Sequence, residues 1–401
     1  MNKDLLFLCH RIPYPPNKGD KVRSFNILKQ LARDYRVHLG AFIDDEADWR
    51  YVDEVARHCG ETCFLRVDAR RARLRSLPYL LSRRPLSLPY YRDAAMARWV
   101  SGMLARFDMA RVFVYSGAMA QYVCGRKYSR LHRVIDLVDV DSEKWRQYAA
   151  RHRWPMSWVY RREGETLLAF ERRVAAAFDA TVLVSGAEAD LFKKLAPEAR
   201  HVEGIHNGVD TDYFSPARDY TNPYPLAGEP IVFTGAMDYW ANVDAVSWFA
   251  RDILPRVVAK RPEARFYIVG ARPSPAVLDL RRLSGVMVVG AVHDIRPYLA
   301  HARVVVAPLR IARGIQNKVL EAMAMARPVV ATPDALDGLH VEAGREVAAA
   351  GRAAGFAAAV TKILAAADSD SMGAQARHRV EEDYSWEQNL QRLKTLLEAA
   401  G

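Results

Sequence analysis

The stretch RGIQNKVLEAMAMARPVV, Arg313 to Val330, decides the fold, because it combines a loop, a helix start and a strand in one short unit. The apolar run from Val304 to Ala307, followed by Pro308, predicts a strand that leads into this loop. We expect a helix from about Lys318 to Ala326, which Pro328 ends before a second short strand. In an open α/β sheet, ligands lie beyond the carboxyl ends of the strands, where the next helix begins.

The start of this helix is a candidate anion site. Its free backbone N–H groups and the positive end of its dipole favour phosphate, and Gly314 lets the backbone come close. Lys318 and Glu321 are three residues apart and share a helix face. The lysine suits a diphosphate, and the carboxylate one turn deeper can accept two hydrogen bonds from a ribose. With Asn317 as N-cap, a capping-box carboxylate would fall at position 320, so Glu321 is free for that role. The alternative is a surface ion pair on an ordinary amphipathic helix.

This segment resembles the donor-binding motif of the retaining family 4 glycosyltransferases, in which two glutamates separated by seven residues precede EAxAxGxPVV. Glu321 matches the second glutamate, and Arg313 stands at the position of the first. In the family the first carboxylate contacts the donor sugar, so the resemblance implies a catalytic-site position for Arg313. We interpret the arginine as a subfamily trait.

The resemblance extends over nearly the full length. Consecutive family segments are similar to HNGVDxxxFxP (His206 to Pro216), IVFTGAMDYWANVDA (Ile231 to Ala245), FYIVGA (Phe266 to Ala271) and VVGAVHDIRPYLAHARVVVAPL (Val288 to Leu309). The front half, with HRIPYPPNKGDKVRSFNIL and DLVDVDSEKW, resembles the branch associated with bacterial exosortase and PEP-CTERM exopolysaccharide systems. The implied fold is GT-B: α/β, with two Rossmann-like domains whose parallel sheets face each other across a cleft.

Composition and element pattern agree with two α/β domains. The chain has 401 residues, of which 50% are hydrophobic and 26% charged, enough for two ordinary cores. Neither GxGxxG nor GxxxxGK[ST] occurs, which weakens dinucleotide and P-loop interpretations. We expect an acceptor-binding domain over residues 1–203, a linker over 204–228, a nucleotide-sugar domain over 229–383 and a last helix in 384–401 that returns to the first domain.

Strands are expected at ten places, where short apolar runs alternate with helical patterns. They are Asp4 to Cys9, Val37 to Phe42, Val112 to Tyr115, Arg133 to Val138, Ala180 to Ser185, Ile231 to Thr234, Arg265 to Val269, Val286 to Val289, Val304 to Ala307 and Val329 to Ala331. No run approaches a membrane span, and no signal peptide is apparent, so we expect a cytoplasmic protein.

The positive charge is concentrated in the front half. Residues 1–200 hold 36 Lys and Arg against 24 Asp and Glu, while the remainder holds 22 against 23. Residues 66–106 alone contain ten arginines and two aspartates, interleaved with leucines. This pattern favours an anionic membrane surface, and we expect peripheral attachment to the inner face of the plasma membrane. A solvated helical face is the alternative, and specific nucleic-acid binding is not expected.

The donor diphosphate needs cationic or N–H partners. Family members carry an Arg and a Lys after the first strand of the second domain, but the segment from Gly235 to Asn242 has neither. We therefore assign this role to Lys318 with Arg310 or Arg313, assisted by backbone N–H groups at Gly19, Gly235 and Gly314. By resemblance, Val292 in the loop from Gly290 to Asp294 contacts the nucleobase, and an ordinary turn is the alternative. We expect His206, Asn207 and Gly208 to build the hinge and its turn, where Asn and Gly tolerate a left-handed backbone.

Asp139 and Asp141 form a DxD pair after an apolar strand. We expect these carboxylates to orient the acceptor hydroxyl, and a metal pair carrying the donor diphosphate is the rival interpretation. Asp136, within the strand, is expected to be structural. No metal and no cofactor beyond a UDP- or GDP-sugar donor is predicted.

The resulting hypothesis is a retaining glycosyltransferase that moves a sugar to a lipid-linked or polysaccharide acceptor in exopolysaccharide synthesis. The alternatives are a sugar-nucleotide epimerase on the same fold, a metal-dependent DxD transferase, and a non-enzymatic basic protein that binds membrane or nucleic acid.

Overall fold

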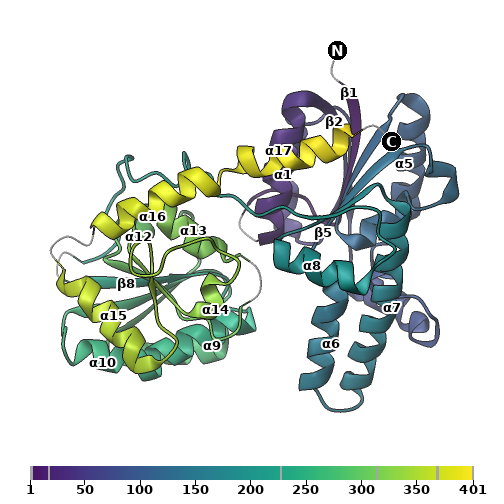
Figure 1. The fold of residues 1–401 in the computed structure, drawn as a ribbon. Helices are drawn as coiled ribbons and strands as arrows, with labels where there is room; N and C mark the ends of the chain where they lie inside the picture. Colours follow the sequence, from purple (N-terminus) through teal and green to yellow (C-terminus); the bar gives the residue numbers. More distant parts are fainter. Residues whose placement is uncertain (1–2, 17–18, 226–227, 313–314, 367–369, 400–401) are drawn as a thin grey trace. The chain divides into compact units, whose positions relative to one another are not determined.

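A computed structural model describes residues 3–16, 19–225, 228–312, 315–366 and 370–399. The chain divides into two compact units (Figure 1). Unit 1 comprises Met1–His206 with Leu390–Gly401, and unit 2 comprises Asn207–Asn389. The predicted site residues Arg313 and Gly314 lie outside the described residues.

Unit 1 is built on a parallel sheet. Over the described residues it has seven strands in the order β3-β2-β1-β4-β5-β6-β7. Their bounds are β1 Lys3–Cys9, β2 Tyr35–Ile43, β3 Thr62–Arg66, β4 Arg111–Tyr115, β5 His132–Val138, β6 Ala180–Leu183 and β7 Val202–Gly204. The central strands are continuous apolar runs because both of their faces are covered, and Leu5 to Cys9 of β1 are fully buried.

The main helices of unit 1 are α1 Gly19–Asp34, α5 Ala94–Arg106, α6 Asp141–Arg151, α7 Met156–Ala177 and α8 Gly186–Leu195. The side chain of Asp93 caps α5, and that of Ser185 caps α8. Helices α6 and α7 lie side by side and extend beyond the sheet (Figure 1). Three short helices, α3 Ala69–Ser76, η2 Leu77–Leu81 and α4 Ser87–Tyr90, follow β3.

The last helix, α17 Trp386–Glu398, contributes its second half to unit 1. Arg111 Nε donates to the carbonyl of Leu397 at 2.8 Å, and the His132 ring lies 2.7 Å from the carbonyl of Leu396. Lys394 pairs with Asp34 at 3.0 Å. These contacts fasten the end of the chain to the edge of the sheet where its strands begin.

Unit 2 repeats the same architecture. Its described strands form a six-stranded parallel sheet in the order β10-β9-β8-β11-β12-β13. The strands are β8 Glu229–Thr234, β9 Ala264–Val269, β10 Val286–Gly290, β11 Val304–Ala307, β12 Val329–Ala331 and β13 Ala348–Ala349. The helices that matter for the site are α9 Trp240–Trp248, α12 Arg296–Ala300 and α13 Asn317–Ala324. A second core fills this unit, separate from that of unit 1.

All ten expected strands are present, so the prediction of two parallel-sheet α/β domains is confirmed. Three strands, β3, β7 and β13, were not predicted. They are edge or near-edge strands of five, three and two residues, and their half-buried side chains lack a long apolar run. Among the described residues, the helices are all too short or too polar to cross a bilayer.

Candidate functional site

The amino end of α13 lies at the carboxyl edge of the unit 2 sheet, after β11. Its N-cap is Gln316, which makes no side-chain capping hydrogen bond. The expectation that Asn317 caps the helix is wrong, because Asn317 is the first helical residue and its Oδ1 accepts a hydrogen bond from Asn207 Nδ2 at 3.2 Å. A helix start without a side-chain cap keeps its N–H groups available to an anion.

Lys318, in the first turn of α13, points back towards the end of β8. Its Nζ donates to Asn242 Oδ1 at 2.6 Å and lies 4.2 Å from the centroid of the Phe233 ring. Burial lowers the pKa of Lys318 to about 7, and the negative charge of Glu321 opposes that shift. An anion bound beside this amine would restore its charge.

Glu321 lies one turn further along α13. Burial raises the pKa of Glu321 to about 7, with Lys318 opposing the shift. Within the described part of the chain, its carboxylate receives no hydrogen bond. Glu321 is partly buried, so its carboxylate has lost some of its hydration and favours a ligand group that donates to it. Its oxygens are therefore available to the hydroxyl groups of a ligand.

Two glycines bring backbone into contact at the ends of β8 and β9. A Cβ on Gly270 would lie 1.6 Å from the carbonyl oxygen of Gly235, and the φ of Gly270 is +156°. A Cβ on Gly235 would lie 2.8 Å from Asn242 Nδ2 and 3.2 Å from Lys318 Nζ. Asn242 Nδ2 in turn donates to the carbonyl of Ala236 at 2.9 Å. Gly235, Asn242 and Lys318 thus form one packed polar group.

Two other residues predicted to bind the donor, Arg310 and Val292, have different surroundings. The Arg310 guanidinium is half exposed, pairs with Asp244 of α9 at 2.5 Å and lies over the Trp248 ring. Val292 is partly buried against the core, in the loop between Gly290 and α12. Neither position brings the side chain into the group formed by Gly235, Asn242 and Lys318, and their roles stay predictions.

In the hinge segment, close packing accounts for the glycine at position 208. Asn207 and Gly208 do not adopt the left-handed backbone that these residue types tolerate. Gly208 is needed for close packing instead, because a Cβ there would lie 2.6 Å from the backbone nitrogen of Trp386 and 2.8 Å from the carbonyl oxygen of Tyr384. The backbone of Val209 pairs with this same segment, at Tyr384 and Ser385.

In unit 1, Asp139 and Asp141 share one cation. Lys144 Nζ lies 2.6 Å from Asp139 Oδ2 and 3.1 Å from Asp141 Oδ1. Although burial disfavours the charged amine, the two carboxylates raise the pKa of Lys144 above its ordinary value. No cluster of three or more His, Cys, Asp or Glu arranged for a metal ion occurs in the residues described. The ammonium group occupies the place between the two carboxylates that a divalent ion would need.

The turn that carries Asp139 is held by Asp136, whose expected structural role the contacts support. Arg23 Nε donates to Asp136 Oδ2 at 2.7 Å, and both side chains are buried. Asp136 Oδ1 accepts from the backbone of Val138, whose φ of +69° is strained for a β-branched residue. Ser116, at the end of neighbouring β4, also has a positive φ, of +78°. Strained strand ends of this kind are concentrated at functional sites.

A further polar cluster at the end of β1 was not predicted from the sequence. Arg11 pairs with Asp20 at 2.5 Å and with Asp44 at 2.7 Å, and His10 Nε2 lies 3.6 Å from Asp20. Burial disfavours the charged imidazole, but the interaction with Asp20 outweighs it and raises the pKa of His10 to about 9. Gly19, which the sequence predicts as a backbone donor, begins α1 beside this cluster and is exposed. The signal was the run HRIP directly after a buried strand.

Comparison with known proteins agrees with the fold. Residues 228–366 match the family described as Glycosyl transferases group 1. The structure of sucrose-phosphate synthase from Thermosynechococcus elongatus is similar, with 17% identity, a TM-score of 0.70 and 98% of each chain covered. Anabaena Alr3699/HepE in complex with UDP-glucose has 14% identity and a TM-score of 0.68, covering 99% of this chain and 100% of its own.

WaaG, a glycosyltransferase involved in lipopolysaccharide biosynthesis, has 16% identity and a TM-score of 0.64, over 99% of this chain and 100% of its own. A search of the curated proteins found no match. These likenesses extend over the whole chain, whereas the family match covers most of unit 2. The chain therefore has the GT-B fold of two Rossmann-like α/β domains, and its residues 228–366 match the group 1 glycosyl transferases.

Proposed function

We propose that the chain is a retaining glycosyltransferase that takes a sugar from a UDP- or GDP-sugar held by unit 2. The observation that carries the proposal is the pair of Lys318 and Glu321 on α13, both partly buried, of opposite charge type and with pKa values both near 7. Perturbed pairs of this kind are concentrated at functional sites. Alr3699/HepE, of the same fold, has been crystallised with UDP and UDP-glucose, which favours UDP as the nucleotide.

The donor's charged and sugar parts have different partners. The diphosphate lies against the amino end of α13 and the amine of Lys318, with Gly235 close enough for backbone contact. The ribose hydroxyls donate to Glu321, whose carboxylate no described residue satisfies. When the bond between the sugar and the diphosphate breaks, negative charge grows on the diphosphate, and Lys318 stabilises it there.

Unit 1 holds the acceptor in this proposal. Its strand-end carboxylates Asp139 and Asp141 orient the acceptor hydroxyl, and Lys144 fixes their positions without a metal ion. Asp136, which accepts a hydrogen bond from the backbone of Val138, keeps this strained turn in one conformation. In a retaining reaction the hydroxyl attacks the face that the diphosphate leaves. The acceptor loses one proton, and the nucleoside diphosphate departs as an anion.

We further propose a bacterial exopolysaccharide role at the inner face of the plasma membrane. In support, residues 66–106 carry ten arginines, and the hairpin of α6 and α7 exposes aromatic side chains near its tip. Trp154 is 81% exposed and Trp158 49%, and Arg153 beside them is also exposed. Tryptophan with nearby arginine is typical of a protein surface that enters the headgroup layer.

The test is release of nucleotide from a panel of UDP- and GDP-sugars by the purified protein. We expect release that EDTA does not affect. Replacing Glu321 with Ala should lower turnover about a hundredfold or more, because hydrogen bonds to a charged group contribute about 1.5–3 kcal/mol each. The matched control is Glu263→Ala, at an exposed carboxylate of the same unit. Normal turnover in Glu321→Ala, or strict dependence on Mg²⁺ or Mn²⁺, would contradict the proposal.

A further inference from the structure

A hollow in unit 1 lies at the carboxyl ends of two neighbouring parallel strands. It has a volume of about 390 Å³, and its lining includes Phe42 from β2 and Arg66 from β3. The register pairs Ile43 with Arg66 at this edge. Ligands in open α/β sheets bind at this edge, and hollows of some 300 Å³ or more hold small molecules. We call this hollow, with its lining residues, the arginine cavity.

Arginine dominates the lining. Arg66, Arg71, Arg75 and Arg92 all contribute, against two carboxylates, those of Asp68 and Asp93. Both carboxylates are already occupied as helix N-caps. Asp68 Oδ1 accepts from the backbone of residues 70 and 71, and Asp93 Oδ1 accepts from residues 95 and 96. The arginine cavity therefore has an excess of positive charge.

Arg75 is held in a fixed orientation. Its Nε donates to the carbonyl of Pro89 at 2.9 Å and its Nη2 to that of Tyr90 at 3.0 Å. Arg66 and Arg71 pair with Glu46 and Asp68, but all four of these side chains are at least half exposed, so these ion pairs are weak. A phosphoryl group can outcompete them, because guanidinium binds phosphate bidentately.

An apolar ridge lies on α3, which lines the cavity, and on η2, which follows α3 in the chain. Leu74 of α3 is 66% exposed, and Leu77 and Leu81 of η2 are 54% and 94% exposed. All three lie within one short segment of two consecutive helices. Leucines exposed to this degree mark a surface suited to an apolar partner.

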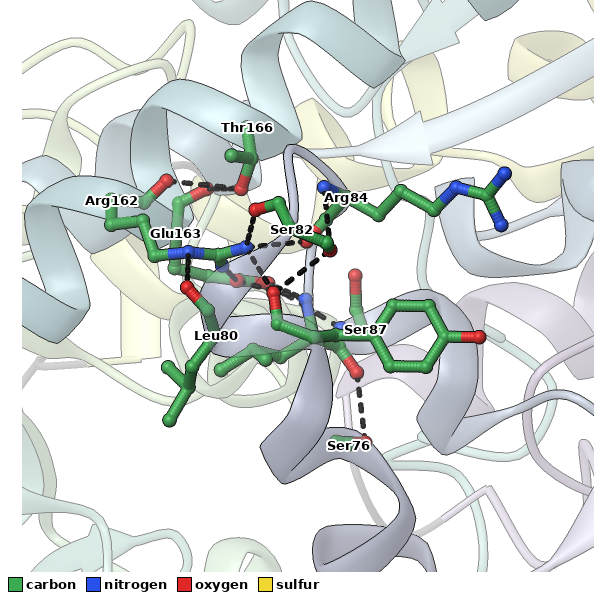
Figure 2. A network of polar contacts seen from close by, with 10 residues as sticks. Ser76, Leu80, Ser82, Arg84, Ser87, Arg162, Glu163 and Thr166 are labelled. Atoms are coloured by element: carbon green, nitrogen blue, oxygen red, sulfur yellow. Dashed lines mark hydrogen bonds and ion pairs between the residues drawn. The ribbon is translucent and has the colours of Figure 1, made fainter.

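Arg162 and Glu163 of helix α7 hold the backbone of the segment that carries and follows η2 (Figure 2). Arg162 donates to the backbone carbonyls of Tyr79, Leu80, Ser82 and Arg84. The buried carboxylate of Glu163 accepts from the backbone of Leu86 at 2.9 Å and of Ser87 at 3.4 Å. Burial of Glu163 raises its pKa, so holding the segment in this way has a cost. The backbone on both sides of Leu81 is therefore held in place by α7.

From these observations we infer that the arginine cavity binds the diphosphate group of a lipid-linked acceptor, and that the leucine ridge contacts the first carbons of the lipid chain. The inference rests on the proposed function and names the chemistry of its acceptor. The cavity suits a headgroup in size, and the apolar chain lies outside it along Leu74, Leu77 and Leu81. Tyr90 in the lining stacks edge-on with Tyr91, which contacts His10, so the cavity adjoins the polar cluster at the end of β1.

The experiment measures binding of farnesyl diphosphate, inorganic pyrophosphate and farnesol to the full-length protein by calorimetry, with UDP added to occupy unit 2. We expect farnesyl diphosphate to bind more tightly than pyrophosphate, and farnesol to bind weakly. Arg71→Gln and Arg75→Gln should each lower the affinity for farnesyl diphosphate about tenfold or more. Arg73→Gln is the matched control, since Arg73 lies on the same helix but does not line the cavity.

The leucine ridge has its own readout. Leu81→Ser should remove the advantage of farnesyl diphosphate over pyrophosphate and leave pyrophosphate binding unchanged. If the wild-type protein binds farnesyl diphosphate and pyrophosphate equally tightly, the lipid chain makes no contact. That result would overturn the assignment of a lipid and favour a free phosphate ligand. An equal loss of farnesyl diphosphate affinity in Arg71→Gln and Arg73→Gln, or no binding of farnesyl diphosphate to the wild type, would overturn the assignment of the site. UDP affinity, measured separately in each variant, reports on the donor proposal alone.

Discussion

Raising the pH should weaken nucleotide binding through Lys318. In the free protein burial lowers the pKa of Lys318 to about 7, so between pH 8 and pH 9 most molecules carry a neutral amine there. A bound diphosphate favours the charged form of the amine, so Lys318 must take up a proton from solution when the nucleotide binds. Because the folded pKa is depressed, each pH unit above 8 reduces the charged fraction about tenfold. The affinity for UDP should fall about tenfold between pH 8 and pH 9.

Titration of Glu321 does not contribute to the change in UDP affinity between pH 8 and pH 9. Burial raises its pKa to about 7, so it is ionised throughout pH 8 to 9 and its ability to accept ribose hydrogen bonds is constant there. Below pH 7 Lys318 is charged and Glu321 becomes protonated, so the curve should flatten. The terminal phosphate of the nucleotide loses its last proton near pH 6 and is also constant above pH 8.

Calorimetry at several pH values, in two buffers of different ionisation enthalpy, measures both the affinity and the protons taken up. We expect close to one proton at pH 8.5. Lys318→Gln should bind UDP more weakly and show a flat profile, whereas Lys260→Gln, at an exposed lysine of the same unit, should behave like the wild type. A flat wild-type profile from pH 8 to 9, or a slope retained in Lys318→Gln, would refute the reasoning.

Three further predictions concern packing, membrane contact and the acceptor side. In a thermal unfolding assay, Gly270→Ala should lower the free energy of unfolding by about 3 kcal/mol or more, because the new Cβ would overlap a carbonyl oxygen. The control Gly344→Ala, in open space at φ +91°, should lower it by roughly 1 kcal/mol in the same assay. The fluorescence of Trp154 and Trp158 should shift to the blue with vesicles rich in phosphatidylglycerol and not with neutral vesicles, and replacing both with Ser should abolish sedimentation with them. Lys144→Met should lower the rate of transfer to the acceptor about tenfold and leave the UDP affinity unchanged, since two adjacent carboxylates lose their shared cation. Equal losses in the transfer rate and in the UDP affinity would contradict an acceptor-side role for these carboxylates.

The sequence predicts the fold well because buried parallel strands are continuous apolar runs. Val304–Ala307 and Val329–Ala331 were placed with their observed bounds. Strand β13, only two alanines, depends on pairing with β12 and carries no local signal of its own. The edge strand β3, TCFLR, is half-buried and mixes polar with apolar residues.

The candidate site is predictable where local spacing decides it. Lys318 and Glu321 share a face of α13 because of helical geometry alone. The partner of Lys318, Asn242, is 76 positions earlier in the chain and meets it only through the sheet. The salt bridge between Arg310 and Asp244 and the bridging of Asp139 and Asp141 by Lys144 likewise depend on side-chain placement that a pattern of residue types does not contain.

A structure of the protein with bound UDP tests the central claim most directly. The account predicts that the diphosphate lies against the backbone N–H groups that begin α13, with Lys318 Nζ within hydrogen-bond distance of a phosphate oxygen. It also predicts that both ribose hydroxyls donate to the carboxylate of Glu321. A nucleotide bound elsewhere, or bound in unit 2 with Glu321 making no contact to its ribose, would contradict the account.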